Sequence, residues 1–514
     1  MSYLLGIDVG TSGTKALLID ANNNGEIVAS CTKTYPLYTP RPLWAEQEPE
    51  DWWQATISAI RQILEDSGAE PKQVKGIGLS GQMHGSVFLD ENNEVIRPAI
   101  LWCDQRTQAE CDWIMDTVGR EKTIELISNP VLTGFTAGKI IWLRNNEPEA
   151  YKQVRKVLLP KDYIRFKLTG EYATEVSDAS GTALFNVVKR EWAWEMLDAI
   201  GIPREWMPKC YESPEISGRI TPEAASLTGL AEGTPVVGGG GDQAAGAVGN
   251  GIVEPGIISS TVGTSGVVFA FAEKPVVDPK LRVHTFCHAV PGKWHVMGVM
   301  LSAGGSLRWY RDAFCGVEGI VAKALGRDPY DLMSEEAANV PPGSEGLIFL
   351  PYLTGERTPY ADANARGVFF GITLRSDKAH FIRAVMEGVA YGLRDSFSIL
   401  EEMKIPIRQV RASGGGARSE LWRQIQADVT GYDHVTINFD EGPALGVAIL
   451  AGVGTGIYPS VEKACRSIIK VVNTTKTNAE RKSIYDHYYP VYRSLYQSLK
   501  DEFAKVAEVI RQET

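Results

Sequence analysis

The sequence predicts an α/β protein built from two related halves. Residues 3–20 contain two apolar runs joined by the polar turn Gly10–Lys15, which is the pattern of a β-hairpin. Residues 256–272 repeat this pattern around a second Gly-Thr-Ser-Gly turn, Gly263–Gly266. Because the same four residues recur between matching apolar runs near the start of each half, we expect a duplicated core. A chain of 514 residues is long enough for about two to four domains.

Between and after the two hairpins, helical and strand patterns alternate. Glu50 or Asp51 is expected to cap the first helix, and Ser419 to cap a later one. Tyrosines at helical spacing after Tyr458 are expected to pack rather than to bind a ligand. The predicted elements are the helix Trp52–Asp66, the strand Val74–Leu79, helices within 134–146 and at Lys161–Phe166, the strand Pro235–Val237, the helix from Phe381 to about Met403, the strand Val410–Ala412, the helix from Ser419 to Asp428 and a small-residue helix from Gly442.

Composition excludes several functional classes. The net charge is −11 and the isoelectric point is near 5.4, so a nucleic-acid or anionic-membrane partner is not expected. Seven scattered cysteines without a Cys-x-x-Cys pair predict neither a disulfide framework nor a zinc site, and favour a reducing compartment. With no run of 18 apolar residues and no basic leader, we expect a soluble, cytoplasmic protein.

Asp242 is the leading candidate for a catalytic residue. It follows the four glycines Gly238–Gly241 and precedes small residues that predict a tightly packed helix. A carboxylate in the first turn of a helix is held as an anion, and it can bind a hydroxyl and accept its proton. The alternative is a glycine-rich turn in which Asp242 serves only as a cap.

Three glycine-rich segments are suited to a nucleotide. The first turn offers backbone N–H groups, hydroxyls and an ammonium, which suit phosphates, although it lacks the Walker spacing. Two such hairpins facing a cleft would hold a polyphosphate from both sides. The strand, turn and helix around Gly414–Arg418 would bring backbone close to a flat or anionic ligand. The candidate residues are Gly10, Thr11, Ser12, Gly13, Lys15, Gly263, Thr264, Gly266, Gly414, Gly415, Gly416 and Arg418.

Polar groups at the end of the strand Val74–Leu79 suit a second ligand. His84 is able to hydrogen-bond a substrate, although a lone histidine is more often structural. The segment from Trp102 to Arg106 suits a sugar surface, or else Asp104 and Arg106 pair with each other. The loop 351–359 is either a flap or a domain contact, and His284, His288 and His295 lack metal-ligand spacing.

Taken in order, these motifs resemble the carbohydrate kinases of the glycerol kinase and xylulokinase group, within the actin and Hsp70-like ATPase superfamily. The resemblance runs from Ile7–Thr11 to the helix at Gly442–Gly452. Gly81–Gly85 is similar to the xylulokinase form of the sugar site, and the segments 100–102, 159–163 and 355–359 are also similar to that subgroup.

The resemblance implies two actin-like (ribonuclease H-like) domains with a duplicated core and a cleft between them. Residues 1–250 would bind the sugar, and residues 251–514 would bind ATP and end in a helical tail from about 460. It implies transfer of phosphate from ATP to the C5 hydroxyl of D-xylulose, with Mg²⁺ as cofactor and a possible homodimer. The resemblance implies that Asp242 is the catalytic base and that Asp8 lies near Mg²⁺. It implies that the three glycine-rich segments bind ATP. The residues implied to bind the sugar are Met83, His84, Trp102, Asp104, Asp242 and Gln243.

Two departures from the subgroup bear on substrate choice. Gln243 stands where many xylulokinases have Asn, and Cys103-Asp104-Gln105-Arg106 replaces their usual segment after the tryptophan. A kinase of another ketose or polyol, such as ribulose, glycerol or a deoxy sugar, therefore remains an alternative. A non-enzymatic ATP-dependent switch of the actin-like superfamily is the other.

Overall fold

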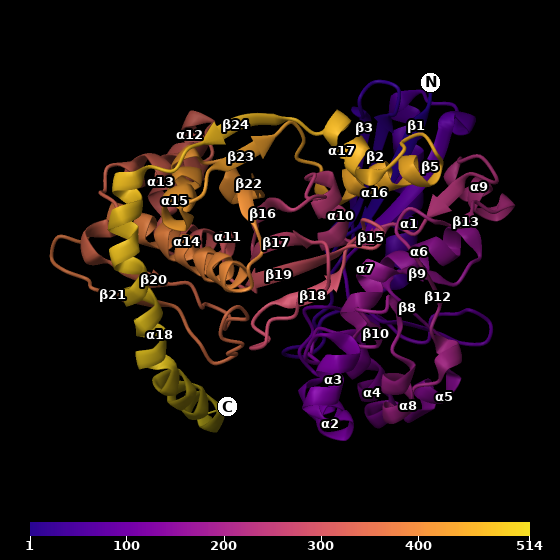
Figure 1. Ribbon diagram of the computed structural model, residues 1–514, viewed down its shortest axis with the longest axis horizontal. Coiled ribbons are helices and arrows are strands. Elements are labelled where there is room, and N and C mark those ends of the chain that lie inside the picture. The colour runs from indigo at the N-terminus through magenta and orange to yellow at the C-terminus, as the bar shows by residue number, and fades with distance from the viewer. Residues whose placement is uncertain (514) are drawn as a thin grey trace.

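The protein consists of two lobes, each built on a mixed sheet (Figure 1). The computed structural model describes residues 1–513. The first sheet has the order β13-β14-β5-β1-β2-β3, with β15 paired to β5. Its strands are β1 (Tyr3–Val9), β2 (Gly13–Asp20), β3 (Glu26–Thr34), β5 (Val74–Gly81), β13 (Ile216–Arg219), β14 (Pro235–Val237) and β15 (Gly240–Gly241).

The second sheet has the order β18-β19-β17-β16-β22-β23-β24. In both sheets the first strand of the predicted hairpin lies at the centre: β1 pairs antiparallel with β2 and parallel with β5, as β16 does with β17 and β22. This correspondence confirms the expected duplication. The strands are β16 (Gly256–Val262), β17 (Gly266–Ala272), β18 (His284–Cys287), β19 (Trp294–Met300), β22 (Ile407–Ser413), β23 (His434–Ile437) and β24 (Val471–Thr475).

Helices and short strand pairs surround the two sheets. The helices are α1 (Pro49–Ser67), α2 (Gln108–Val118), α3 (Arg120–Ile127), α4 (Thr136–Asn146), α5 (Pro148–Gln153), α6 (Pro160–Thr169), α7 (Val176–Ala179), α8 (Trp194–Ile200), α9 (Pro222–Thr228), α10 (Asp242–Gly249), α11 (Gly304–Phe314), α12 (Gly316–Leu325), α13 (Pro329–Ala338), α14 (Lys378–Glu402), α15 (Glu420–Thr430), α16 (Gly442–Gly454), α17 (Val461–Ile468) and α18 (Ala479–Glu513). The short strands are β4 (Glu46–Gln47), β6 (Val87–Leu89), β7 (Ala99–Ile100), β8 (Lys156–Leu158), β9 (Ala173–Glu175), β10 (Phe185–Asn186), β11 (Glu191–Trp192), β12 (Lys209–Tyr211), β20 (Ile348–Leu350) and β21 (Val368–Phe370).

The helices α10 and α16 cross between the lobes in very close contact (Figure 1). A Cβ at Gly446 would lie 1.8 Å from the carbonyl oxygen of Ala245, and one at Gly249 would lie 2.0 Å from that of Gly442. α16 also covers β1 and β5, where a Cβ at Gly78 would meet the carbonyl of Val447 at 2.0 Å. Glycine is therefore required for this approach. A helix from the second half of the sequence thus packs on the first sheet.

The predicted helices and strands agree with the structure apart from details at their ends. Ser419 caps α15, because its hydroxyl accepts a hydrogen bond from the Trp422 amide at 3.2 Å. The cap expected at Glu50 or Asp51 is wrong: Glu48 precedes α1, makes no side-chain cap, and both acids lie within the first turn. There they still favour the helix through its dipole.

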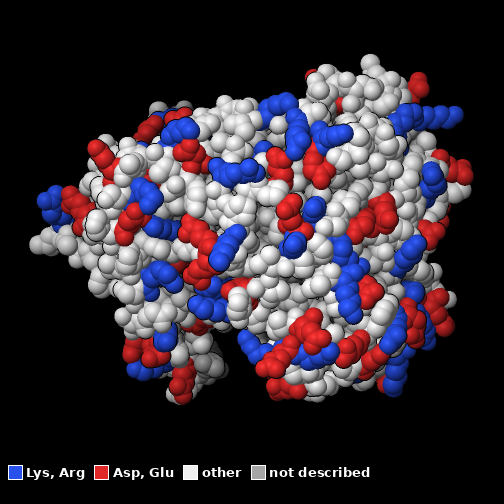
Figure 2. Space-filling model, in the orientation of Figure 1, with Lys and Arg blue, Asp and Glu red and all other residues white. Residues whose placement is uncertain are grey.

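The tyrosine face of α18 packs against the second lobe, as predicted. Tyr485 and Tyr492 are fully buried, and the Tyr352 hydroxyl donates to that of Tyr492 at 3.0 Å. Within residues 1–513, no helix combines the length and apolar character needed to cross a membrane. On the face shown in Figure 2, acidic and basic side chains are interspersed.

Candidate active site

Strand register brings the two candidate carboxylates to the same edge of the first sheet. Asp8 near the end of β1 pairs with Ser80 of β5, and Ser80 pairs in turn with Gly240 of β15. Asp242 follows β15 directly and is the first residue of α10. The predicted position of Asp242 in the first helical turn is therefore confirmed.

The glycine run before Asp242 is needed because other chain segments approach its backbone closely. Gly239 has φ +74°, and a Cβ there would lie 1.9 Å from the carbonyl oxygen of Leu79. At Gly241 a Cβ would lie 3.0 Å from Cγ of Met83. The run thus combines a tight bend with close packing against the end of β5.

Two buried side chains fix this loop in place. Arg165 on α6 donates to the carbonyl oxygens of Val237 at 2.6 Å and of Gly238 at 2.7 Å. The amide of Gly241 donates to the Glu175 carboxylate at 3.2 Å. These contacts hold the strand-to-helix turn from both sides, so the position of Asp242 does not depend on its own side-chain contacts alone.

Behind the loop lies a fully buried cluster of charges centred on Lys161. Its ammonium lies 2.8 Å from Asp162, 2.9 Å from Asp178 and 3.6 Å from Glu175. Burial acts to lower the pKa of Lys161, but the three carboxylates outweigh it and keep the pKa above its usual value. Lys161 therefore stays charged and neutralises acids that support the Asp242 loop. The expected scaffold role of the helix at 161–166 agrees with these contacts.

Burial makes both candidate carboxylates unusually basic. Burial raises the pKa of Asp242 to about 7, and the negative charge of Asp8 adds to the increase. Burial raises the pKa of Asp8 to about 6, although the nearby Ser80 hydroxyl and the positive charge of Lys15 oppose the shift. A pKa near neutrality suits a general base, which must accept a proton at the working pH.

His84 is held in one orientation by its neighbours. It has φ +67°, a strained conformation for a non-glycine residue, and its carbonyl accepts hydrogen bonds from Lys139 Nζ at 2.7 Å and Thr136 Oγ1 at 3.0 Å. Its Nδ1 donates to the carbonyl oxygen of Gly181 at 2.6 Å. Burial keeps the pKa of His84 well below its usual value, so the ring is neutral and Nε2 is an acceptor.

The first glycine turn is linked to the predicted sugar side of the site. The indole N–H of Trp102, a residue with 37% of its surface exposed, donates to Thr11 Oγ1 at 3.0 Å. The Thr11 hydroxyl donates to Gln82 Oε1 at 3.2 Å. Lys15 forms an ion pair with Glu441 at the start of α16. The turn thus contacts both β5 and a segment from the second half of the chain.

Asp104 differs from the expectation of a substrate contact. Its side chain is completely buried, where it accepts hydrogen bonds from the Ala45 amide at 2.7 Å and from the Arg106 guanidinium at 2.7 to 3.0 Å. The alternative pairing with Arg106 is therefore the observed one, and Asp104 supports the Trp102 loop. Met83 is 4% exposed and packs between Gly181 and Gly241, while Gln243 is partly buried beside Asp242.

A cavity of about 440 Å³ lies beside the second glycine turn. Five predicted nucleotide residues line it, namely Gly263, Thr264, Gly415, Gly416 and Arg418. Gly266 and Gly414 shape the backbone nearby, since a Cβ would lie 2.6 Å from Met300 and 2.7 Å from the Val262 carbonyl oxygen, respectively. The sequence reasoning missed the rest of the wall, which includes Gly304, Gly305, Leu307, Arg308, Asp328, Tyr330, Asp331, Ser334 and Trp422. The small-residue run 302–306 was the available signal.

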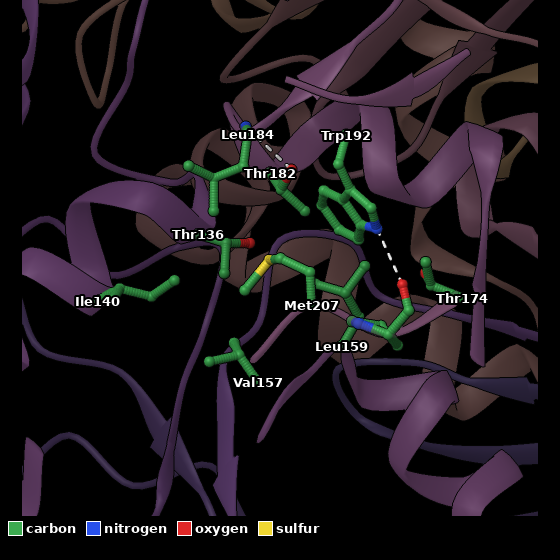
Figure 3. A pocket seen from close by; sticks show the side chains of 10 residues that line it. Thr136, Ile140, Val157, Leu159, Thr174, Thr182, Leu184, Trp192 and Met207 are labelled. Atoms are coloured by element: carbon green, nitrogen blue, oxygen red, sulfur yellow. Dashed lines mark hydrogen bonds between the residues drawn. The ribbon is translucent and has the colours of Figure 1, made fainter. Parts of the chain in front are cut away.

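A much smaller cavity of about 10 Å³ is lined by residues of α4, β8, β9 and β11 (Figure 3). Thr136, which supports the His84 carbonyl, borders it together with Thr174, Thr182 and Trp192. The volume has room for about one water molecule and is far too small for a sugar. We therefore regard it as a packing defect and not as a ligand site.

The second lobe also reaches the His84 region, through β18. The Cys287 amide donates to Ser180 Oγ at 3.1 Å, next to the Gly181 carbonyl that orients His84. The ring of Phe135 lies between His84 and His284, with ring centroids 4.7 and 5.8 Å away. This part of the site is thus formed by both halves of the chain, which the sequence reasoning did not foresee.

Most of the chain matches one protein family. The N-terminal domain of the FGGY family of carbohydrate kinases matches residues 3–249, and its C-terminal domain matches residues 258–455. The chain is 42% identical to the xylulose kinase of Escherichia coli over 96% of this chain and 99% of that protein. It is 35% identical to the gluconokinase of Bacillus subtilis over 99% of this chain and 98% of that protein.

A solved structure of similar fold is that of ligand-bound xylulose kinase from Lactobacillus acidophilus. Its TM-score is 0.91 at 27% identity, with 98% of this chain and 100% of that chain covered. The duplicated two-lobe architecture found here is therefore shared by known sugar kinases, in agreement with the predicted fold class.

Proposed function

Because this chain belongs to the FGGY family of carbohydrate kinases, we propose that it transfers the terminal phosphoryl group of ATP to the C5 hydroxyl of D-xylulose. The products are D-xylulose 5-phosphate and ADP. The single observation that carries the proposal is the position of Asp242 beside Asp8, where burial and repulsion raise its pKa to about 7. The xylulose kinases of Escherichia coli, Bacillus subtilis and Lactococcus lactis match nearly the full chain, which supports the ketose as substrate.

The proposed reaction depends on aligning the sugar hydroxyl with the γ-phosphate of ATP, and it needs no covalent bond between the protein and the phosphoryl group. Asp242 accepts the proton of the sugar hydroxyl as that oxygen attacks the γ-phosphorus. His84, neutral and oriented by Gly181, accepts a hydrogen bond from another sugar hydroxyl through Nε2. Gly10–Gly13 and Gly263–Gly266 bind the phosphates, and the 440 Å³ cavity takes the adenosine.

The residues around Asp8 fit a divalent cation. Asp8 Oδ1 is buried and makes no hydrogen bond of normal geometry among residues 1–513, although the Ser80 hydroxyl is near enough to lower the pKa of Asp8. Oxygen donors of this kind suit Mg²⁺, which keeps several waters and binds through one or two carboxylates and the nucleotide phosphates. Bound there with ATP, Mg²⁺ would neutralise phosphate charge. The role of Asp8 in this proposal is to hold the cation.

We further propose that residues 1–250 form the sugar-binding domain and residues 251–514 the ATP-binding domain, with the crossing of α10 and α16 as the hinge. Closure about this hinge would exclude water, which otherwise competes with the sugar as acceptor. Slow hydrolysis of ATP without sugar is the expected consequence. We also propose that the protein is cytoplasmic and that it forms a homodimer.

A panel of acceptors tests the proposed function. ADP release with Mg²⁺-ATP is measured for D-xylulose, D-ribulose, L-ribulose, glycerol, gluconate and no acceptor. We expect strong stimulation by D-xylulose above all others. Stronger stimulation by another acceptor would show that this acceptor, and not D-xylulose, is the substrate. ATP binding without stimulation by any acceptor would support the non-enzymatic actin-like switch instead.

A further inference from the structure

We propose that Arg357, from the second half of the chain, is a substrate-binding residue that holds a carbonyl or hydroxyl oxygen of the sugar. The inference rests on the proposed function, because it assigns a new ligand to the same sugar. Arg357 belongs to the loop 351–359, whose role the sequence left open between a flap and a domain contact.

The loop places Arg357 next to the strands that reach His84. Its neighbour Thr358 donates from its amide to the Val299 carbonyl oxygen and accepts from the Val299 amide, at 2.9 and 3.0 Å. Val299 lies on β19, and β19 pairs with β18, where His284 stands opposite Met297. Thr358 also donates to the Arg282 carbonyl oxygen at 2.9 Å, two residues before His284. The loop is therefore anchored rigidly against the strand that carries His284.

His284 and His84 lie on the two sides of one aromatic cluster. The ring centroid of Phe286 is 5.5 Å from that of His284 and 6.5 Å from that of His84, and Phe135 also lies near both. Burial lowers the pKa values of both histidines. The positive charge of Arg357 adds to this effect at His284, and at His84 it adds to the larger effect of Lys139. Together with the anchoring of its loop on β19, this places Arg357 in the region of the two histidines.

Glu356 is the acid that acts on the Arg357 guanidinium, and its charge opposes the lowering of the Arg357 pKa by burial. Its carboxylate already accepts the backbone amides of Leu301 at 3.0 Å and Arg357 at 2.7 Å. Glu356 therefore makes no direct hydrogen bond to the guanidinium. Within residues 1–513 the structure gives the Arg357 guanidinium no ion pair and no hydrogen bond, while burial lowers its pKa.

The Arg357 side chain is partly exposed, so its N–H donors, which bind no other residue among residues 1–513, are accessible to a ligand. In the same region, His284 is 95% buried and its Nδ1 has no hydrogen-bond partner. A polyhydroxy ketone offers several oxygens that accept hydrogen bonds, and Arg357 supplies the donors that neutral His84 lacks at Nε2. Because Arg357 is carried by the second half, its contact would also join the two halves around the sugar.

Substitution of Arg357 by Gln tests this role, with Arg366→Gln as a matched control. Arg366 lies on the same segment, but it is exposed and donates only to the carbonyl oxygens of Ala363 and Ala365. We expect Arg357→Gln to raise the KM for D-xylulose about 10- to 100-fold, which is the effect of losing a charged hydrogen-bond donor. The KM for ATP and the sugar-free hydrolysis of ATP should stay within twofold, and Arg366→Gln should match the wild type throughout.

Sugar analogues that lack one oxygen each identify the contact. The wild type should bind the analogue that lacks the oxygen held by Arg357 more weakly than it binds D-xylulose. The Arg357→Gln variant should bind this analogue and D-xylulose equally well, because the contact is already absent. Arg357→Lys, which keeps the charge, should recover part of the loss. An unchanged sugar KM in folded Arg357→Gln, or equal effects on sugar and ATP, would overturn the proposal. Absence of sugar turnover in the wild type would instead refute the proposed function.

Discussion

The Nδ1 of His84 donates to the carbonyl oxygen of Gly181 at 2.6 Å, across 97 residues of sequence. This one contact fixes the tautomer of the ring, because a carbonyl oxygen can only accept. It leaves Nε2 as an acceptor. The neutral histidine is thereby made complementary to a sugar hydroxyl and not to a phosphate.

Gly181→Ala should disturb this contact directly. A Cβ at position 181 would lie 2.4 Å from Cε1 and 2.5 Å from Nδ1 of His84, so the ring must move. We expect the KM for D-xylulose to rise at least about tenfold, the value of one well-placed hydrogen bond, with the KM for ATP unchanged. Gly319→Ala, where a Cβ would meet open space, is the control. Equal sugar kinetics for both variants would show that His84 does not bind the substrate.

The pH dependence of kcat/KM for the sugar should reflect Asp242. Its pKa is raised to about 7, and only the ionised form accepts a proton, so activity should fall as pH decreases through about 7. In the metal-free protein, where Asp8 holds no cation, Asp8→Asn should shift the titration midpoint of Asp242 to lower pH, because it removes the negative charge that helps to raise the pKa of Asp242. Asp116→Asn, on the exposed surface of α2, should leave the midpoint unchanged. A midpoint near 4 in the wild type would contradict the assignment.

Lys161→Met should destabilise the protein strongly. The change leaves Asp162, Asp178 and Glu175 buried together without their shared cation. Removing one partner from a buried ion pair typically costs about 3–5 kcal/mol. The control is Lys167→Met on the same helix, where the lysine is partly exposed and pairs weakly with Glu50 at 4.0 Å. Urea unfolding measures both variants, and similar midpoints would show that the buried cluster contributes little to stability.

Gly446→Ala should separate α10 from α16 at the proposed hinge. The new Cβ would lie 1.8 Å from the Ala245 carbonyl oxygen, and forced overpacking of this kind costs about 1–3 kcal/mol. At Gly246, on the facing helix, the nearest atom to a Cβ is Pro443 Cγ at 3.6 Å, so Gly246→Ala should be tolerated. Thermal unfolding and kcat are measured for both. A normal kcat and unfolding temperature for Gly446→Ala would show that the helix crossing is not critical.

Much of the fold could be predicted from the sequence, because its signals are local. The hairpins around Gly10 and Gly263 have apolar runs on both sides of a turn, and Ser419 and the glycines before Asp242 mark their helices by residue type. The packing of α16 on the first sheet could not be predicted. It depends on contacts between Gly78 and Val447 and between Gly446 and Ala245, and no periodicity reveals them.

The site was predictable only where its residues belong to motifs. Asp242, His84 and the second glycine turn could be proposed in this way. The contacts of Gly181 and Lys139 with His84 were not foreseen, because they arise between segments that meet only in the folded chain. For Asp104 the sequence left two interpretations open, and only the observed burial and pairing with Arg106 decided between them.

The rate of Asp242→Asn tests the central claim, that Asp242 is the general base, most directly. ADP release with saturating D-xylulose and Mg²⁺-ATP is compared with the wild type, and ATP binding is measured on the same protein. We expect turnover to fall at least about 100-fold, since a positioned base typically contributes about 10²–10⁴-fold, while ATP binding stays within twofold. Turnover near that of the wild type would contradict the claim.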